Sequence, residues 1–212
     1  MKVTDKITIT NEDNMELMSR YPDNYFDLAI VDPPYGIGAG SKKFINGTSK
    51  TIKDYYKDND WDIAPKKEYF NELFRVSKNQ IIWGGNYFVE YLKNFRCFIF
   101  WDKTIHGNSY ADGELAWTSF DNVARYYRKN IAQVTSEGRQ HPTQKPITLY
   151  EFCLMRYAKE GDKILDTHLG SGSIALACHN LGYELTACEL DKDYFEASIK
   201  RINNHISQQR LF

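Results

Sequence analysis

The tetrapeptide Asp32-Pro33-Pro34-Tyr35 follows directly on a short apolar run, residues 26–31. Such a run is typical of a buried strand, and the two prolines prevent a helix from starting after it. An ionised carboxylate and a prolyl carbonyl only accept hydrogen bonds, so together they can take both hydrogens of an exocyclic amine on a planar base. Tyr35 can stack on the face of that base. The tetrapeptide therefore predicts a cradle for an aromatic amine; the alternative is a proline-stiffened turn with an exposed aspartate.

A second candidate site is the glycine-containing loop at residues 166–173, between a predicted strand and a predicted helix. Glycines and a helix N-terminus allow backbone N–H groups to approach a ligand closely. Glu189 ends the next predicted strand, where a carboxylate can accept both hydroxyls of a ribose. These features predict a nucleoside-containing ligand; the alternative is a tight turn that binds nothing.

The same loop also satisfies the dinucleotide fingerprint, with Gly170, Gly172 and Ala175 at the required spacing. Asp166 argues against a dinucleotide, because an acid beside the loop would repel a pyrophosphate and attract a sulfonium or an ammonium. Only one helix is expected after Glu189, whereas a dinucleotide fold needs several further strands. A positively charged nucleoside is therefore the favoured ligand, and an NAD-linked oxidoreductase is the alternative that the loop alone allows.

The elements that must position these loops alternate between strand and helix along the chain. Strands are expected at residues 7–10, 26–31, 80–83, 95–101, 113–120, 163–165 and 183–188. Helices are expected at residues 13–20, 66–77, 146–158, 173–181 and from the N-cap Asp191 to about 207. This alternation predicts an α/β fold with a mostly parallel twisted sheet and helices on both faces. A single domain spanning residues 1–212 is expected, with irregular insertions at about 36–65 and 121–140.

Composition narrows the class of protein. With 27 Lys and Arg against 28 Asp and Glu, the net charge is −1, so a polyanion must be held by a local basic face. The 42% hydrophobic content excludes a disordered chain.

The longest apolar run, residues 95–101, is too short to span a bilayer. The N-terminus lacks the apolar core of a signal peptide, and the four cysteines form no Cys-x-x-Cys pair. We therefore expect a reduced, cytoplasmic protein without a metal site.

Three motifs together resemble the DNA adenine-N6 methyltransferases that use S-adenosyl-L-methionine (AdoMet). They are residues 32–35, the segment His141-Pro142-Thr143-Gln144-Lys145-Pro146, and the loop at residues 166–172. The catalytic motif precedes the AdoMet motif, which resembles the permuted β group of that family. The match runs from about residue 7 to residue 205. The resemblance implies a Rossmann-like AdoMet-dependent methyltransferase fold with a circularly permuted motif order.

The resemblance also assigns roles to individual residues. The catalytic residues that it implies are Asp32, Pro33, Pro34 and Tyr35. The cofactor-binding residues that it implies are Asp13, Asp32, His141, Thr143, Lys145, Asp166, Thr167, His168, Gly170, Gly172 and Glu189. Two departures from the family are visible: Asp13 lacks the glycine that usually precedes this acid, and Thr167-His168 replaces the usual Pro-Phe. We expect His168 to pack the loop rather than to act as a base.

The implied reaction moves a methyl group from the sulfonium of AdoMet to the N6 amine of an adenine flipped out of DNA, without a metal. DNA contacts are expected from two basic segments. Their cationic residues are Lys42, Lys43, Lys50, Lys53, Arg125, Arg128, Lys129 and Arg139. The segment between residues 120 and 141 is short for target recognition, which suggests a short site or a homodimer that shares recognition. A cognate restriction nuclease is a further implied partner.

Four alternatives keep some of these features. An RNA adenine methyltransferase or a protein-glutamine methyltransferase carries a similar Pro-Pro loop, although those families more often begin it with Asn and place the AdoMet loop first. A cytosine-N4 methyltransferase uses the same amine cradle but usually has Ser at the position of Asp32. A catalytically silent AdoMet- and DNA-binding module is the alternative from another class, and the intact acids argue against it.

Overall fold

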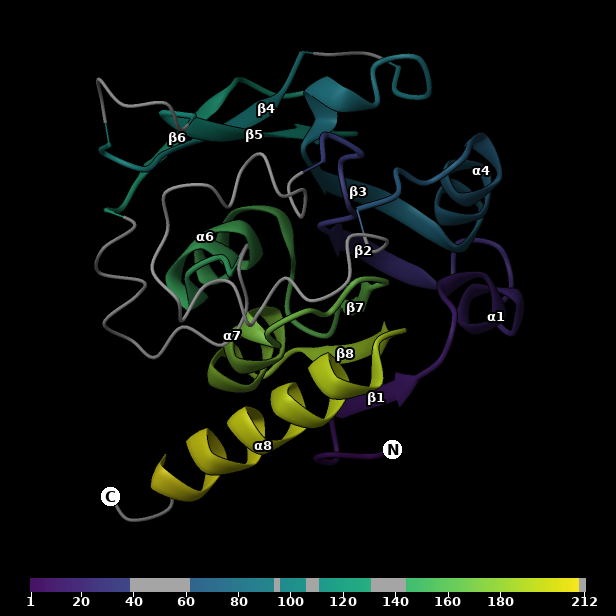
Figure 1. Ribbon diagram of the computed structural model, residues 1–212, viewed down its shortest axis with the longest axis vertical. Coiled ribbons are helices and arrows are strands. Elements are labelled where there is room, and N and C mark those ends of the chain that lie inside the picture. Colours follow the sequence, from purple (N-terminus) through teal and green to yellow (C-terminus); the bar gives the residue numbers. More distant parts are fainter. Residues whose placement is uncertain (39–61, 94–95, 106–110, 131–143, 210–212) are drawn as a thin grey trace.

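The computed structural model describes residues 1–38, 62–93, 96–105, 111–130 and 144–209, and its centre is an eight-stranded sheet (Figure 1). The strands are β1 (Ile7–Asn11), β2 (Phe26–Val31), β3 (Ser77–Trp83), β4 (Phe98–Asp102), β5 (Gly113–Thr118), β6 (Arg125–Arg128), β7 (Lys163–Asp166) and β8 (Glu184–Glu189). The helices are α1 (Asn14–Ser19), α4 (Lys67–Val76), α6 (Ile147–Tyr157), α7 (Ser173–Leu181) and α8 (Lys192–Gln209), with a 3₁₀ turn, η3 (Gly85–Tyr87).

The sheet is mostly parallel, as the sequence predicts. Its strand order is β1-β8-β7-β2-β3-β5-β4-β6, and only β5 runs antiparallel to its neighbours β3 and β4. The carboxyl ends of β1, β8, β7, β2 and β3 therefore meet at one edge of the sheet. Because β5 runs the other way, its first residues lie at that same edge. This arrangement brings side chains from distant parts of the chain together at one edge of the sheet.

Both faces of the sheet are covered by helices, and β2 shows how its sequence allows this. Leu28 and Ile30 belong to the core beneath α6, α7 and α8, whereas Ala29 and Val31 belong to the core beneath α1 and α4 (Figure 1). Successive side chains of a strand point to opposite faces, so a continuous apolar run is what a strand buried on both faces requires. All four cysteines are buried free thiols. Among the helices of the described ranges, none has the length and apolar character to cross a membrane.

The expected elements are largely confirmed, and α7 has the predicted bounds. Asp191 also caps α8 as predicted, because its Oδ1 accepts the backbone N–H groups of Asp193 and Tyr194. One expectation is wrong in its described part: residues 121–130 of the segment 121–140, expected to be irregular, contain the edge strand β6. This strand has no apolar run, and it forms because β4 supplies its hydrogen-bonding partner. Residues 131–140 and most of the expected insertion at 36–65 lie outside the described residues.

Candidate functional site

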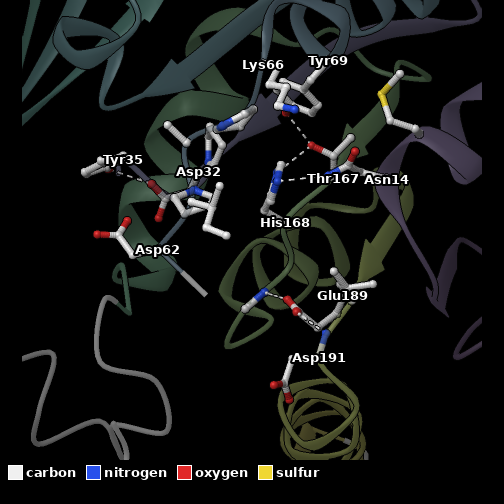
Figure 2. A pocket seen from close by; sticks show the side chains of 18 of the residues that line it. Asn14, Asp32, Tyr35, Asp62, Lys66, Tyr69, Thr167, His168, Glu189 and Asp191 are labelled. Carbon is white, nitrogen blue, oxygen red and sulfur yellow. Dashed lines mark hydrogen bonds between the residues drawn. The ribbon is translucent and has the colours of Figure 1, made fainter. Parts of the chain in front are cut away.

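A cavity of about 670 Å³ lies at the edge of the sheet where the parallel strands end (Figure 2). Its walls come from the loop after β2, the loop after β7, the ends of β1 and β8, the start of α4 and the start of β5. The size is in the range of small-molecule and cofactor pockets. In Figure 2, Asp32 and Tyr35 lie on one side of this cavity, and Glu189 and Asp191 lie apart from them. The two motifs identified in the sequence therefore face one shared space.

Asp32 stands directly after β2, with its carboxylate at the cavity. Its Oδ1 accepts the Tyr35 hydroxyl at 2.8 Å, and its Oδ2 accepts the Lys145 ammonium. Burial raises the pKa of Asp32, and the charge of Lys145 opposes that rise. Each carboxylate oxygen has a second acceptor site, so both can still accept a hydrogen bond from a ligand.

Tyr35 is fixed at both its hydroxyl and its ring. Burial raises the pKa of Tyr35, so the phenol stays protonated and donates to Asp32. The ring stacks on Tyr87 of η3, with centroids 5.0 Å apart and an interplanar angle of 20°. Gly84 lies close to this ring, because a Cβ on Gly84 would be 2.2 Å from the Tyr35 Cε1. A residue without a side chain is needed there, and its φ of +68° also favours glycine.

Lys145 is buried beside Asp32, with 2% of its surface exposed. Its Nζ contacts Asp32, the Glu114 Oε2 at 2.9 Å and the Tyr35 hydroxyl at 3.3 Å. Lys145 is not one of the described residues that line the cavity, so its contact with the cofactor stays a prediction. Glu114, at the start of β5, and Lys103, 2.5 Å from it, were missed by sequence reasoning. The only local signal was an acid near the start of an otherwise apolar strand.

Glu189 ends β8 and lines the cavity from the side of the glycine loop. Its Oε2 accepts the N–H of Gly170 at 2.8 Å, and its Oε1 accepts the N–H of Asp191 at 3.0 Å. Burial raises the pKa of Glu189, and these backbone hydrogen bonds oppose that rise. The second acceptor site of each oxygen is available for the predicted ribose hydroxyls.

Asp166 supports the glycine loop instead of lining the cavity in the described part of the chain. Its carboxyl is buried and accepts the N–H of His168 at 3.0 Å. Burial raises the pKa of Asp166 to about 8, so a positive charge nearby would be needed to keep it ionised at neutral pH. The predicted attraction for a sulfonium therefore depends on how closely such a ligand approaches.

Thr167 and His168 line the cavity and join the loop to two helices. The Thr167 hydroxyl lies 2.7 Å from the hydroxyl of Tyr69 on α4, and the His168 Nε2 lies 3.2 Å from the Asn14 Nδ2 on α1. Since an amide nitrogen donates, Nε2 accepts, and Nδ1 carries the proton toward Thr167 at 2.9 Å. Burial lowers the pKa of His168 to about 3, so the ring is neutral at pH 7. This position fits the expected packing role of His168.

Comparison with known proteins decides the family. Residues 41–200 match the model of the N6/N4 DNA methylases. This chain belongs to the N6/N4 DNA methylase family. Among its relatives, the type II methyltransferase M2.DpnII of Streptococcus pneumoniae is 24% identical, and the match covers 93% of this chain and 90% of the relative. The putative methylase YubD of Escherichia coli is 26% identical, with 90% and 87% covered.

Solved structures agree with the DNA methylase fold. The M1.HpyAVI–SAM complex aligns with a TM-score of 0.62 at 21% identity, covering 93% of this chain and 99% of that one. The cytosine-N4-specific PvuII DNA methyltransferase aligns with a TM-score of 0.63 at 13% identity, covering 97% and 93%. These likenesses confirm the predicted methyltransferase fold. Because they include a cytosine-N4 enzyme, they do not distinguish the target base.

Two residues of this DNA methylase that were expected at the cofactor serve elsewhere in the described structure. Asp13 is the N-cap of α1, where its Oδ1 accepts the N–H of Met15 at 2.7 Å. Its neighbours Glu12, Asn14 and Met15 line the cavity instead. Gly172 precedes α7, and a Cβ there would be 3.1 Å from the Ile202 Cδ1 of α8. The direct cofactor contacts of Asp13 and Gly172 stay predictions.

Most of the expected DNA-binding residues cannot be placed. The DNA-binding candidates Lys42, Lys43, Lys50, Lys53 and Arg139 lie outside the described residues, as do the cofactor-binding candidates His141 and Thr143. Arg125 and Arg128 lie on the edge strand β6, and Lys129 follows it. The Arg128 side chain is 64% exposed, and its Nε lies 3.7 Å from the Asp102 carboxylate. The DNA-binding candidates within the described ranges therefore lie at the sheet edge farthest from β1.

Proposed function

We propose that this DNA methylase transfers the methyl group of AdoMet to the N6 amine of an adenine. The observation that carries the proposal is the position of Asp32, whose carboxylate faces the same cavity as Glu189. The carboxylate of Asp32 is suited to accept hydrogen bonds from an amine, and that of Glu189 is suited to accept them from the hydroxyls of a ribose. Their shared cavity is the arrangement that transfer between a nucleoside cofactor and a base requires.

The cofactor end of the cavity is formed by Glu189 and the glycine loop. AdoMet supplies an electrophilic methyl group on a sulfonium. Glu189 would accept its ribose hydroxyls, with the carboxylate already oriented by Gly170 and Asp191. The neutral His168 and Thr167 would line the cavity next to it. The lining residues fit a nucleoside with a positive charge, since the carboxylates that line the cavity outnumber its cations.

Asp32 and the Pro33 carbonyl would accept the two hydrogens of the target amine. An aromatic amine is a weak nucleophile because its lone pair is delocalised into the ring. Hydrogen bonds from both hydrogens favour a pyramidal nitrogen and offset the positive charge that develops during transfer. Asp32 is suited to this role because Tyr35 and Lys145 fix both of its oxygens.

Tyr35 would replace part of the stacking that the base loses when it leaves the duplex. Flipping a base costs a few kcal/mol, and a stacked aromatic ring offsets part of that cost. Tyr87 already occupies one face of the Tyr35 ring. A base stacked on Tyr35 must therefore use the ring face that Tyr87 does not cover.

Adenine is favoured over cytosine because the first residue of the motif is Asp32, where cytosine-N4 enzymes usually carry Ser. The order of the two motifs favours DNA over RNA or a protein glutamine. We also propose a single domain over residues 1–212, DNA contacts from Arg125, Arg128 and the basic residues outside the described ranges, a homodimer, and a cognate nuclease.

The proposal is tested by Asp32→Ala, with the exposed Asp5→Ala as the matched control. DNA from cells that express each variant is digested to nucleosides and analysed by mass spectrometry, and AdoMet binding is measured by calorimetry. We expect N6-methyladenine with the wild type and Asp5→Ala and none with Asp32→Ala, while all three bind AdoMet with similar affinity. Retained methylation by a folded Asp32→Ala protein would reject the role of Asp32.

A further inference from the structure

Four charged side chains form a cluster around the buried Lys145 at the amine cradle: Asp32, Lys145, Glu114 and Lys103. Lys145 Nζ contacts Asp32 and Glu114, and Lys103 Nζ lies 2.5 Å from the Glu114 Oε1. The side chains of Glu114 and Lys103 are 19% and 13% exposed. Two carboxylates and two ammonium groups give the cluster no net charge. Glu114 is thus held by one cation on each side, and one of these cations also holds Asp32.

Glu114 also reaches the aromatic residue of the motif. Its Oε2 lies 3.4 Å from the Tyr35 hydroxyl, which donates to Asp32. The antiparallel direction of β5 brings Glu114 to this edge of the sheet, and Lys103 follows β4 at the same edge. Glu114 therefore contacts both groups that fix the two oxygens of Asp32.

We propose that Glu114 is a positioning residue for methyl transfer, which holds Lys145 and Tyr35 against Asp32 and, with Lys103, sets the ionisation of Asp32. The proposal rests on the proposed role of Asp32 and adds Glu114 and Lys103, which act on Asp32 through Lys145 and Tyr35. Glu114 on β5 and Lys103 after β4 form an ion pair next to the residues that bind the amine.

The direction of each effect follows from the charges. Lys145 lowers the pKa of Asp32 and Glu114 raises it, while burial raises it most. Burial alone would raise the pKa of Glu114, but Lys145 and Lys103 outweigh it and lower that pKa to about 2. Glu114 is therefore ionised at neutral pH. Removing the charge of Glu114 therefore lowers the pKa of Asp32, because Lys145 then pairs with Asp32 alone. Removing the charge of Lys103 raises the pKa of Asp32, because the negative charge of Glu114 is then less compensated.

Other titratable groups face Asp32 from the surrounding elements, and none of them changes charge in the two test variants. They are Tyr35 of the same loop, Tyr69 of α4, Tyr150 of α6 and Asp166 of β7. Burial raises the pKa of all four. Asp166, at about 8, is neutral over the acid range, and the three phenols are neutral throughout.

The test measures kcat/KM for methyl transfer against pH in Glu114→Gln and Lys103→Gln, with Lys78→Gln as the control. Lys78 pairs with Asp27 on the surface, at the opposite end of β3 from the site. The acid limb of such a profile reports groups of the free enzyme. We expect the acid limb to move by about one pH unit to lower pH in Glu114→Gln and by about one pH unit to higher pH in Lys103→Gln. In Lys78→Gln the acid limb should not move. AdoMet affinity should stay within about twofold, and Lys103→Arg should restore the wild-type profile.

Opposite shifts separate positioning from a structural role, because a loosened fold lowers the rate at every pH. If both profiles fall uniformly or shift in the same direction, the proposal is overturned while the role of Asp32 stands. If Asp32→Ala itself methylates DNA, the proposed function fails instead. Should Glu114→Gln not fold, the comparison of Lys103→Gln with Lys103→Arg decides the question alone.

Discussion

Replacing Gly84 with Ala tests whether the position of the Tyr35 ring controls the reaction. A Cβ at Gly84 would stand 2.2 Å from the Tyr35 Cε1 and 2.5 Å from its Cδ1, whereas ordinary contact begins at 3.4 Å. The ring must therefore move by about 1 Å, a misplacement of the size that costs roughly 100-fold in rate when it affects reacting groups. Gly161→Ala is the matched control, because Gly161 also has a positive φ, +85°, but nothing lies within 4 Å of its Cβ position.

The two alanine variants should differ in both turnover and stability. Both accept the left-handed backbone strain of about 1–2 kcal/mol. Gly84→Ala also weakens the hydrogen bond from Tyr35 to Asp32 and the stacking on Tyr87, which adds about 1–3 kcal/mol, and the ring can limit this cost by moving into the cavity. Urea denaturation measures the free energies of unfolding, and radiolabelled methyl transfer to DNA measures turnover. A folded Gly84→Ala protein with turnover within threefold of Gly161→Ala would refute the reasoning.

Two other predictions concern the glycine loop. Glu189→Gln should weaken AdoMet binding about tenfold, because one carboxylate acceptor becomes a donor, whereas Glu184→Gln at the exposed start of β8 should not; equal affinities in calorimetry would contradict this. For His168, the pKa is about 3 in the folded chain and about 6.5 in the unfolded chain, so its contribution to stability is lost as pH falls below 6.5. Because His168 is half-buried, the free energy of unfolding of the wild type should fall by about 1 kcal/mol more between pH 7 and 5 than that of His168→Gln. Equal losses of the two proteins in urea denaturation would argue against this.

Local signals in the sequence were enough to place the two loops. The bounds of β2 and α7 could be predicted because an apolar run ends at Asp32, and Gly172 and Gly182 flank the helix. The residues of three short motifs were enough to predict the methyltransferase fold. In these cases each residue's neighbours along the chain carry the information.

Contacts between distant segments could not be predicted in the same way. Glu114 meets Lys145 only because β5 runs antiparallel and begins where its neighbour β3 ends, a direction that no local pattern in β5 reveals. Strand β6 was missed because its residues, Arg125–Arg128, look polar and depend on β4 for their pairing. Asp13 illustrates a third limit, since an acid before a helix suits both a cofactor contact and an N-cap.

The most direct test of the central claim is modification-sensitive sequencing of DNA from cells that express the wild type or Asp32→Ala. The account predicts N6-methyladenine at one recurring short sequence in the wild type and no modified base with Asp32→Ala. N4-methylcytosine in the wild type would contradict the assignment of adenine. Unmodified DNA from both strains, with a purified protein that still binds AdoMet, would contradict DNA as the substrate of this chain acting alone.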